Sequence, residues 1–256
     1  MSTILILGAT SAVAGRIAEL YAETSTSGAS KKEQSHQIYL IGRREDVIQA
    51  VSQRLGETVV GTDSVDFVDL PATELCIRKA YEVMGSFDYV LIAHGVIGDQ
   101  ILSEASVEEA LTVIEVNYTS VVAQLVTLTA LMANQSAGKI GVITSVAGDR
   151  GRPRNYTYGA AKGALNIYLQ GLRSVRWGSG LEVYTFKLGP VDSPMTVDHE
   201  KNFSFSTIDT VAEKIVQAFE SRRYVHYIPG YWWFVMWVVR WLPEPVFQKL
   251  GFLSDR

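Results

Sequence analysis

Three residues that can do acid–base chemistry around one reacting carbon lie close together in the chain: Ser145, Tyr158 and Lys162. Residues four apart lie on one face of an α-helix, so Tyr158 and Lys162 are expected to point the same way. A cation beside a phenol lowers the pKa of the tyrosine from about 10 toward neutrality, which makes Tyr158 a candidate general acid or base. Ser145 can donate a hydrogen bond to a substrate oxygen. The alternative is a helix whose tyrosine packs and whose lysine is solvated, and this spacing alone does not decide between the two.

The N-terminal stretch predicts a place for a nucleotide. Residues 3–7 are a continuous run of β-formers, typical of a strand buried on both faces of a parallel sheet. The small-residue stretch 8–15 and then a helical pattern follow. Small residues let the backbone approach a pyrophosphate, and the helix N-terminus supplies N–H groups and a partial positive charge. The residues expected to bind a dinucleotide here are Gly8, Thr10, Ser11, Ala12 and Val13. A tight turn without a ligand is the alternative.

The end of the second expected strand, residues 37–41, bears on the choice of cofactor. In folds of this type an acidic residue at this place binds the ribose hydroxyls of NAD, and an arginine accommodates the 2′-phosphate of NADP. Gly42 occupies the acidic place here, and Arg43 and Arg44 follow it. A carboxylate would repel the phosphate, whereas a guanidinium can bind it through two parallel hydrogen bonds. The sequence therefore favours NADP over NAD; the alternative is that both arginines are surface charges.

Strand and helix patterns alternate along the rest of the chain. The further strands are expected at residues 65–68, 88–92, 139–144 and 181–188, and the helices at residues 46–55, 72–84, 158–177 and 207–221, with one or two more within residues 104–132. This alternation predicts an α/β fold with a doubly wound parallel sheet of the Rossmann type. Asp69 and Leu70 follow the third expected strand and are expected to meet an adenine edge. Ser145 follows the fifth strand, where ligands of open α/β sheets bind.

The bulk composition narrows the class of protein. A chain of 256 residues, 47% hydrophobic and 20% charged, suits one large α/β domain. The net charge of −4 and the lack of a basic block argue against nucleic-acid binding. Cys76 is the only cysteine, and the four histidines have no metal-ligand spacing, so no metal site is expected. There is no secretory leader pattern and no apolar run of the roughly 20 residues that span a bilayer, which predicts a cytoplasmic protein.

Several motifs in order resemble the compact type of short-chain dehydrogenase/reductase over nearly the full chain. The stretch 8–15 looks like the glycine motif of that family, with Ala12 and Ala14 in place of the later two glycines. The residues that match its catalytic tetrad in order and approximate spacing are Asn117, Ser145, Tyr158 and Lys162. Several ordered matches are far more specific than any one of them, so the resemblance favours the catalytic interpretation of Tyr158.

Two further motifs carry the resemblance with departures. Residues 93–95 resemble the end of the family's Asn-Asn-Ala-Gly motif but depart at the asparagines and at His94. Residues 189–196 match the motif that follows its sixth strand, with Leu188 in place of the usual proline. The cofactor contacts implied by these motifs are Ala93, His94, Gly95 and Val191. For His94 a packed structural role is favoured over a catalytic one.

The resemblance also implies a role for each residue of the tetrad. Tyr158 transfers a proton to or from the substrate oxygen, and Ser145 hydrogen-bonds that oxygen. Lys162 holds the nicotinamide ribose hydroxyls and lowers the pKa of the tyrosine. Asn117 holds a water that links Lys162 to solvent. The cofactor would carry the hydride, and the protein would supply orientation and electrostatics.

The loop between the serine and the tyrosine carries three arginines within five residues: Arg150, Arg152 and Arg154. This loop is expected to border the substrate, because it connects two candidate catalytic residues. Three cations so close together can bind a phosphate or a carboxylate. A solvated loop is the alternative, and the sequence does not decide between them.

An aromatic segment, residues 231–242, is apolar on every side except for Arg240 and holds four of the five tryptophans. As a helix it would be about 18 Å long, too short to span a bilayer. Tryptophan and tyrosine favour the membrane interface, so we interpret the segment as a membrane-docking or lipid-gathering lid. A dimer interface or a cover for the substrate pocket is the alternative. We accordingly divide the chain into a reductase domain, residues 1–221, and an apolar C-terminal extension, residues 222–256.

Together these features predict an NADP-dependent enzyme that reduces a carbonyl, or oxidises an alcohol, on a hydrophobic or lipid-linked substrate. The aromatic segment and the pair Gly98–Asp99 show a looser resemblance to reductases of polyprenyl-linked keto-sugars. The alternatives are a soluble acyl or small-alcohol dehydrogenase and a non-catalytic nucleotide-binding scaffold of the same fold. We expect a homo-oligomer without nucleic-acid partners, in contact with the inner face of a membrane.

Overall fold

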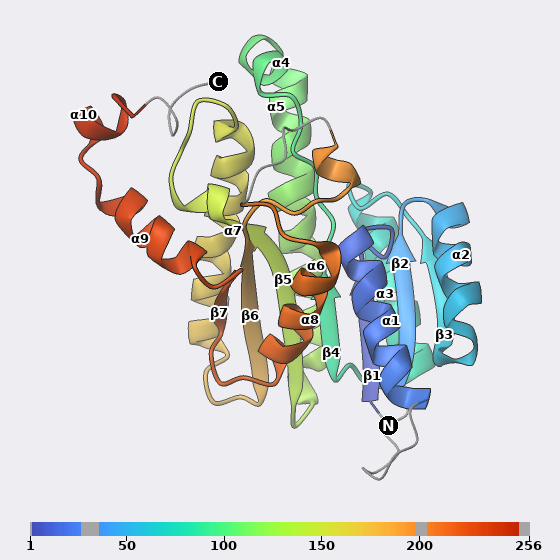
Figure 1. The fold of residues 1–256 in the computed structure, drawn as a ribbon. Coiled ribbons are helices and arrows are strands. Elements are labelled where there is room, and N and C mark those ends of the chain that lie inside the picture. Colours follow the sequence, from blue (N-terminus) through green and yellow to red (C-terminus); the bar gives the residue numbers. More distant parts are fainter. Residues whose placement is uncertain (1, 27–35, 198–203, 251–256) are drawn as a thin grey trace.

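The computed structural model describes residues 2–26, 36–197 and 204–250, and it is built around a seven-stranded sheet (Figure 1). The strands are β1 (Ser2–Leu7), β2 (His36–Gly42), β3 (Val59–Ser64), β4 (Tyr89–Ile92), β5 (Gly138–Ser145), β6 (Leu181–Leu188) and β7 (Val225–Ile228). They lie in the order β3-β2-β1-β4-β5-β6-β7, and every neighbouring pair is parallel. The expected doubly wound parallel sheet is confirmed.

Helices cover both faces of this sheet (Figure 1). On one face, α1 (Ala12–Thr26), α2 (Glu45–Leu55) and α8 (Ile208–Phe219) bury their apolar residues in one core cluster. On the other face, α3 (Leu70–Met84), α6 (Ser120–Leu131) and α7 (Tyr156–Val175) do the same in a second cluster. The shorter α4 (Gln100–Ala105) and α5 (Val107–Ile114) precede α6.

The first strand shows why the sequence runs apolar without a break. Ile4 and Ile6 belong to the core cluster on one face, and Leu5 and Leu7 to the cluster on the other. Successive side chains of a strand point to opposite faces, so a strand covered on both sides must be apolar at every position. The four side chains are at most 1% exposed, and β1 therefore forms the rigid base of the turn that follows it.

The third strand is not where the sequence pattern placed it. We expected residues 65–68, but β3 is Val59–Ser64 and the chain has left the sheet by Val65. The reason is that β3 is an edge strand whose residues are all partly or fully exposed, so it lacks the continuous apolar run of a buried strand. Val65 and Phe67 are apolar because they bury their side chains, 8% and 6% exposed, where the chain passes from the strand toward α3.

The region 104–132, where one or two helices were expected, contains both α5 and α6. Between α5 and α6 the residues Glu115–Thr119 form a π-helical turn, a local widening that is frequent at functional sites. The described helical stretch Val107–Asn134 is long and apolar enough to cross a membrane by length and composition, and half of its most apolar window is buried inside the protein. Its buried side chains pack against α3 and α7, as in a core helix.

The sheet continues past the division that we expected at residue 221. β7 pairs with β6 in parallel through Thr185–Val225 to Leu188–Ile228, so the first part of the presumed extension is the seventh strand of the same sheet. The sequence pattern did not predict this strand, because the strand is short and lies at the edge of the sheet, where only its last residue is buried. The remaining segment, residues 232–247, comprises α9 (Trp232–Trp241) and α10 (Glu244–Phe247) and projects beside the start of α7 (Figure 1). We call this segment the arm.

Candidate active site

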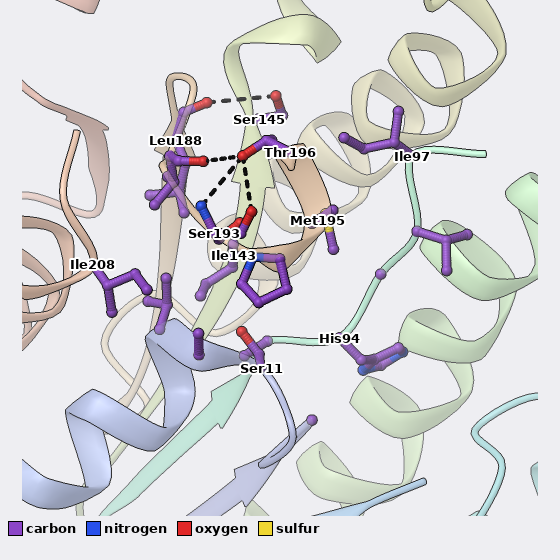
Figure 2. A pocket seen from close by; sticks show the side chains of 18 of the residues that line it. Ser11, His94, Ile97, Ile143, Ser145, Leu188, Ser193, Met195, Thr196 and Ile208 are labelled. Atoms are coloured by element: carbon purple, nitrogen blue, oxygen red, sulfur yellow. Dashed lines mark hydrogen bonds between the residues drawn. The ribbon is translucent and has the colours of Figure 1, made fainter. Parts of the chain in front are cut away.

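A cavity of about 1270 Å³ lies at the carboxyl ends of the strands. It opens beside β1 and β4, which are neighbours in the sheet although the chain leaves them toward opposite edges. Ligands in open α/β sheets bind at such a switch point. The walls come from the β1–α1 turn, the loops after β2, β4, β5 and β6, the start of α7 and the first residue of the arm. Figure 2 shows Ser11, His94, Ser145 and Ser193, one from each of four of these walls.

Three of the four tetrad residues line this cavity: Ser145, Tyr158 and Lys162. Ser145 is the last residue of β5, and the other two lie one turn apart on the first half of α7, as their spacing predicted. The Ser145 hydroxyl donates to the Leu188 carbonyl at 3.4 Å (Figure 2) and accepts from the Ala147 amide at 3.1 Å. The structure therefore brings serine, phenol and ammonium to one wall of one cavity.

The electrostatics of Tyr158 differ from the expectation. Burial raises the pKa of Tyr158 to about 12, and the hydrogen bond with Ser145 opposes this shift only in part. Lys162 Nζ lies 5.8 Å from the centre of the tyrosine ring, and burial lowers the pKa of the lysine to about 8. Desolvation thus disfavours the charged form of both side chains. The phenol keeps its proton at neutral pH and is a proton donor.

Asn117 lies behind this wall and does not line the cavity itself. It sits in the π-helical turn, is 0% exposed, and its amide nitrogen donates to the Val113 and Val96 carbonyls at 2.8 and 2.7 Å. Its Oδ1 accepts from the Val96 amide at 3.2 Å. A Cβ on Gly95 would lie 2.7 Å from Asn117 Oδ1 and 3.2 Å from Lys162 Nζ, so the asparagine and the lysine meet the loop after β4 at the same glycine. The side chain positions that loop beside Lys162.

The β1–α1 turn has the backbone that a phosphate group requires. Gly8 has a φ of +93°, and its amide donates to the Ile41 carbonyl at 2.8 Å. A Cβ at Gly8 would lie 2.6 Å from the His94 amide nitrogen, so this position excludes any side chain. The other residues expected to bind the cofactor here, Thr10, Ser11, Ala12 and Val13, also line the cavity. The residues present therefore fit a dinucleotide, with the N-terminus of α1 facing its phosphates.

Arg43 and Arg44 lie directly after β2 and line the same cavity. Arg44 donates to the Thr10 carbonyl at 3.3 Å and thereby joins the loop after β2 to the phosphate turn. Both side chains are exposed, and no carboxylate among the described residues forms an ion pair with either one. Their charges remain available for an anionic group at this end of the cavity.

Asp69 and Leu70, which were expected to meet the adenine, do not lie at the cavity. Asp69 caps α3 by accepting from the Ala72 amide at 3.0 Å. Because β3 ends at Ser64 instead of at residue 68, the wall is formed by residues 66–68. Sequence analysis missed these three because their apolar alternation resembled a strand.

The loop after β4 supplies Ala93, His94 and Gly95, which line the cavity as expected. His94 stacks on Phe67 at a ring distance of 4.2 Å, and its Nε2 lies 3.0 Å from the Ser120 hydroxyl. Burial lowers the pKa of His94 to about 3, so the ring is neutral. The packed structural role favoured for His94 agrees with this geometry.

The loop after β6 closes the cavity on the opposite side (Figure 2). Val191 is 8% exposed, and its carbonyl accepts from the Thr196 hydroxyl at 2.6 Å. The same hydroxyl accepts from the Ser193 amide at 3.2 Å, so Thr196 holds the loop in a compact turn. Val191 is thus where the resemblance expected it, against the cavity.

The structure adds Trp232, which sequence analysis grouped with the other arm aromatics. Trp232 lines the cavity, and its indole ring lies against Gly189, where any Cβ would overlap it. Trp233 and Trp237 are 57% and 52% exposed and point outward. Only the helical register of α9 distinguishes these three, and an aromatic run without polar positions gives no register.

The three arginines of the loop divide into two groups. Arg150 points away from the cavity: its Nη1 donates to the Val239 and Leu242 carbonyls, both at 2.6 Å, and its guanidinium lies 4.0 Å from the Phe247 ring centre. It anchors the arm to the loop between Ser145 and Tyr158. Arg152 and Arg154 line the cavity.

Residues 2–203 match the family model described as short chain dehydrogenase. The chain is 32% identical over 166 residues to an uncharacterized oxidoreductase of Streptomyces coelicolor, covering 65% of this chain and 66% of that protein. It is 27% identical over 253 residues to an uncharacterized oxidoreductase of Mycobacterium tuberculosis, covering 98% of this chain and 93% of that protein.

Two solved structures share the fold. A variant of actinorhodin polyketide ketoreductase with NADPH superposes with a TM-score of 0.75 at 19% identity, over 90% of this chain and 97% of that one. A short chain dehydrogenase of Burkholderia cenocepacia with NADP gives a TM-score of 0.74 at 15% identity, over 94% and 98%. Because the family model matches most of this chain, the chain belongs to the short-chain dehydrogenase/reductase family of oxidoreductases.

Proposed function

We propose that the protein is an NADP-dependent reductase of a carbonyl group on a hydrophobic or lipid-linked substrate, a keto-sugar among the candidates. The observation that carries this proposal is the wall formed by Ser145, Tyr158 and Lys162 in a cavity that also contains the β1–α1 turn. Bound NADP would supply or accept the hydride. The reverse reaction, oxidation of an alcohol, uses the same groups.

Each residue of this wall has a defined task. Tyr158 keeps its proton, because burial raises its pKa to about 12, and donates it to the substrate oxygen as the carbonyl carbon is reduced. Ser145 hydrogen-bonds the same oxygen and orients it toward the phenol. The Lys162 ammonium lies beside the ring and stabilises the phenolate that remains after proton transfer. Asn117 positions the loop after β4 against Lys162.

The cofactor assignment rests on charge. Arg43 and Arg44 follow β2 and line the cavity, where an arginine accommodates the 2′-phosphate of NADP. The two arginines come first after the strand, and the carboxylates Glu45 and Asp46 follow them in the first turn of α2. Two structures of the same fold were solved with NADPH and NADP, which supports the choice of cofactor class.

The arm supports a hydrophobic substrate and contact with a membrane surface. Trp233, Phe234, Trp237 and Trp241 are 52% to 75% exposed, while Trp232 on the same helix lines the cavity. One short helix therefore connects an aromatic outer surface with the active-site cavity. Each aromatic side chain that enters the interface contributes about 2 kcal/mol before ordering costs.

The chemistry is tested by replacing Tyr158 with phenylalanine. We expect turnover with NADPH to fall by at least about 100-fold while NADPH affinity changes little, because only the proton donor is lost. Tyr156→Phe is the matched control: this tyrosine begins the same helix, is 44% exposed and does not line the cavity. Turnover of Tyr158→Phe within about tenfold of wild type would contradict the assignment.

Membrane contact is tested by co-sedimentation with anionic vesicles and by light scattering. Replacing Trp233, Trp237 and Trp241 by serine is expected to abolish vesicle binding but to spare reduction of a short ketone. Trp232 is kept, because it faces the cavity. Trp177→Ser removes an indole that is 71% exposed outside the arm and serves as the control. If the wild-type protein does not sediment with vesicles, and light scattering gives the triple variant a lower molar mass than wild type, the arm is a homo-oligomer interface instead.

A further inference from the structure

The half-buried side chain of Arg152 lines the cavity, and no carboxylate of the described residues forms an ion pair with it. Its Nε atom is buried and has no hydrogen-bond partner among the described residues. Burial lowers the pKa of Arg152, and the neighbouring Arg154 adds repulsion in the same direction. A guanidinium nitrogen that is removed from water without gaining a partner costs stability, so a protein retains one where a ligand compensates for it.

The carboxylate closest to Arg152 in the chain is already used. Asp149 lies three residues before Arg152, and its Oδ1 accepts from Lys187 Nζ at 2.5 Å. Its Oδ2 accepts from the Tyr227 hydroxyl at 2.6 Å. This network joins the loop to β6 and β7 and leaves Asp149 with both oxygens occupied. Arg152 therefore differs from Arg150, whose guanidinium is fully engaged by the arm.

A second unused donor belongs to a cavity-lining residue of a different element, Trp232, and lies against Gly189. The Trp232 indole nitrogen is buried and has no hydrogen-bond partner in the part of the chain that the structure describes. Buried indole N–H groups ordinarily find an acceptor. Two residues that line one cavity, one cationic and one neutral, thus each carry a buried donor without an acceptor in the described part of the chain, and nothing in the reduction of a carbonyl group accounts for either.

We propose that Arg152 and the Trp232 indole bind an oxyanion of the substrate, a phosphate monoester or a carboxylate, in addition to the carbonyl that Tyr158 protonates. This inference deepens the proposed function and rests on it: the substrate is an amphiphile with an anionic group near its reacting carbon. The arm then contributes to both parts of the substrate, with its outer aromatics on the apolar part and Trp232 on the anion.

The test is calorimetry on protein saturated with NADP, so that the phosphates of the cofactor do not compete. The ligands are octyl phosphate, octanoate, octanol and inorganic phosphate. Wild type is expected to bind octyl phosphate at least about tenfold more tightly than octanol and than inorganic phosphate. Arg152→Gln should remove the preference over octanol, Arg152→Lys should keep part of it, and Trp232→Phe should weaken octyl phosphate but not octanol.

Thermal unfolding separates a binding role from a structural one. Arg152→Gln should be as stable as wild type or more stable, because it removes an uncompensated buried charge. Arg150→Gln, two residues away, should be less stable because it loses the contacts to the arm. If Arg152→Gln is destabilised like Arg150→Gln, or weakens NADP instead of octyl phosphate, the inference is wrong.

The outcome can be distinguished from that of the proposed function. Reduction of 2-octanone with NADPH tests the reductase alone. A wild type that reduces 2-octanone but binds octyl phosphate no better than octanol overturns the oxyanion site and leaves the reductase. Inorganic phosphate bound as tightly as octyl phosphate would show a free-anion site and would also overturn the substrate assignment. A wild type that binds octyl phosphate through Arg152 but reduces no ketone overturns the reductase.

Discussion

Replacing Arg150 by glutamine is expected to release the arm from the loop that precedes the catalytic helix. The arginine side chain is 13% exposed and donates two hydrogen bonds to the carbonyls of Val239 and Leu242 at the end of α9. Charge-assisted hydrogen bonds of this kind contribute about 1.5–3 kcal/mol each, and glutamine can replace at most one of them. We expect docking of the arm to weaken by about 3 kcal/mol once the lost cation–π contact with Phe247 is included.

Hydrogen exchange measures this change locally. Amides of residues 232–247 should open about 100-fold more often in Arg150→Gln, since 1.4 kcal/mol corresponds to a factor of ten. Amides of β5, in the centre of the sheet, should exchange as in wild type. Arg154→Gln is the control for charge, because Arg154 belongs to the same loop but is exposed and has no contact with the arm among the hydrogen bonds and ion pairs of the described residues.

The functional consequence follows from Trp232, the first residue of the arm. When the arm is released, the indole leaves Gly189 and the substrate side of the cavity widens. KM for an apolar ketone should rise while kcat, which depends on Tyr158, changes little. The reasoning is refuted if exchange of residues 232–247 in Arg150→Gln stays within a factor of about three of wild type.

Three further predictions follow from single side chains. Arg43→Asp should weaken NADPH by about tenfold to a hundredfold and NADH much less, and equal affinity of the wild type for both cofactors in a fluorescence titration would contradict the charge argument. Lys162→Met should stabilise the protein at pH 7 by on the order of 3 kcal/mol, since burial lowers the pKa of this lysine from 10.5 to about 8. The penalty is fully present below pH 8 and fades between pH 8 and 10.5, where only the unfolded state binds the proton, so the advantage in urea denaturation must shrink over that window. Gly189→Ala should displace the Trp232 indole and shift its fluorescence. An unchanged emission spectrum would show that the indole does not pack tightly against residue 189.

Much of the fold follows from local pattern. The apolar run of β1 predicts a strand covered on both faces, and the structure sends Ile4 and Leu5 to opposite core clusters. The spacing of Tyr158 and Lys162 predicts a shared helix face, and both line one cavity. These predictions need only the periods of helix and strand, which neighbouring residues determine.

The predictions that were wrong concern elements whose place depends on residues far away in the sequence. An edge strand such as β3 has one paired side and half-exposed residues, so its pattern is weak and the apolar residues after it resemble the strand. The same is true of β7, which the sequence pattern assigned to a separate extension. Asp69 consequently caps α3 instead of facing a cofactor.

The chemistry of individual side chains also depends on tertiary structure. Arg150 and Arg152 are two residues apart, but one contacts carbonyls 89 and 92 positions away and the other enters the cavity. Tyr158 has a raised pKa because burial disfavours the phenolate more than Ser145 favours it. Sequence by itself determined the buried strands and the long helices, and it placed Ser145 at the end of a strand and Tyr158 and Lys162 on one helix. Packing alone decided which donors lose water and which find partners, because desolvation is set by everything that surrounds an atom and not by its neighbours in the chain.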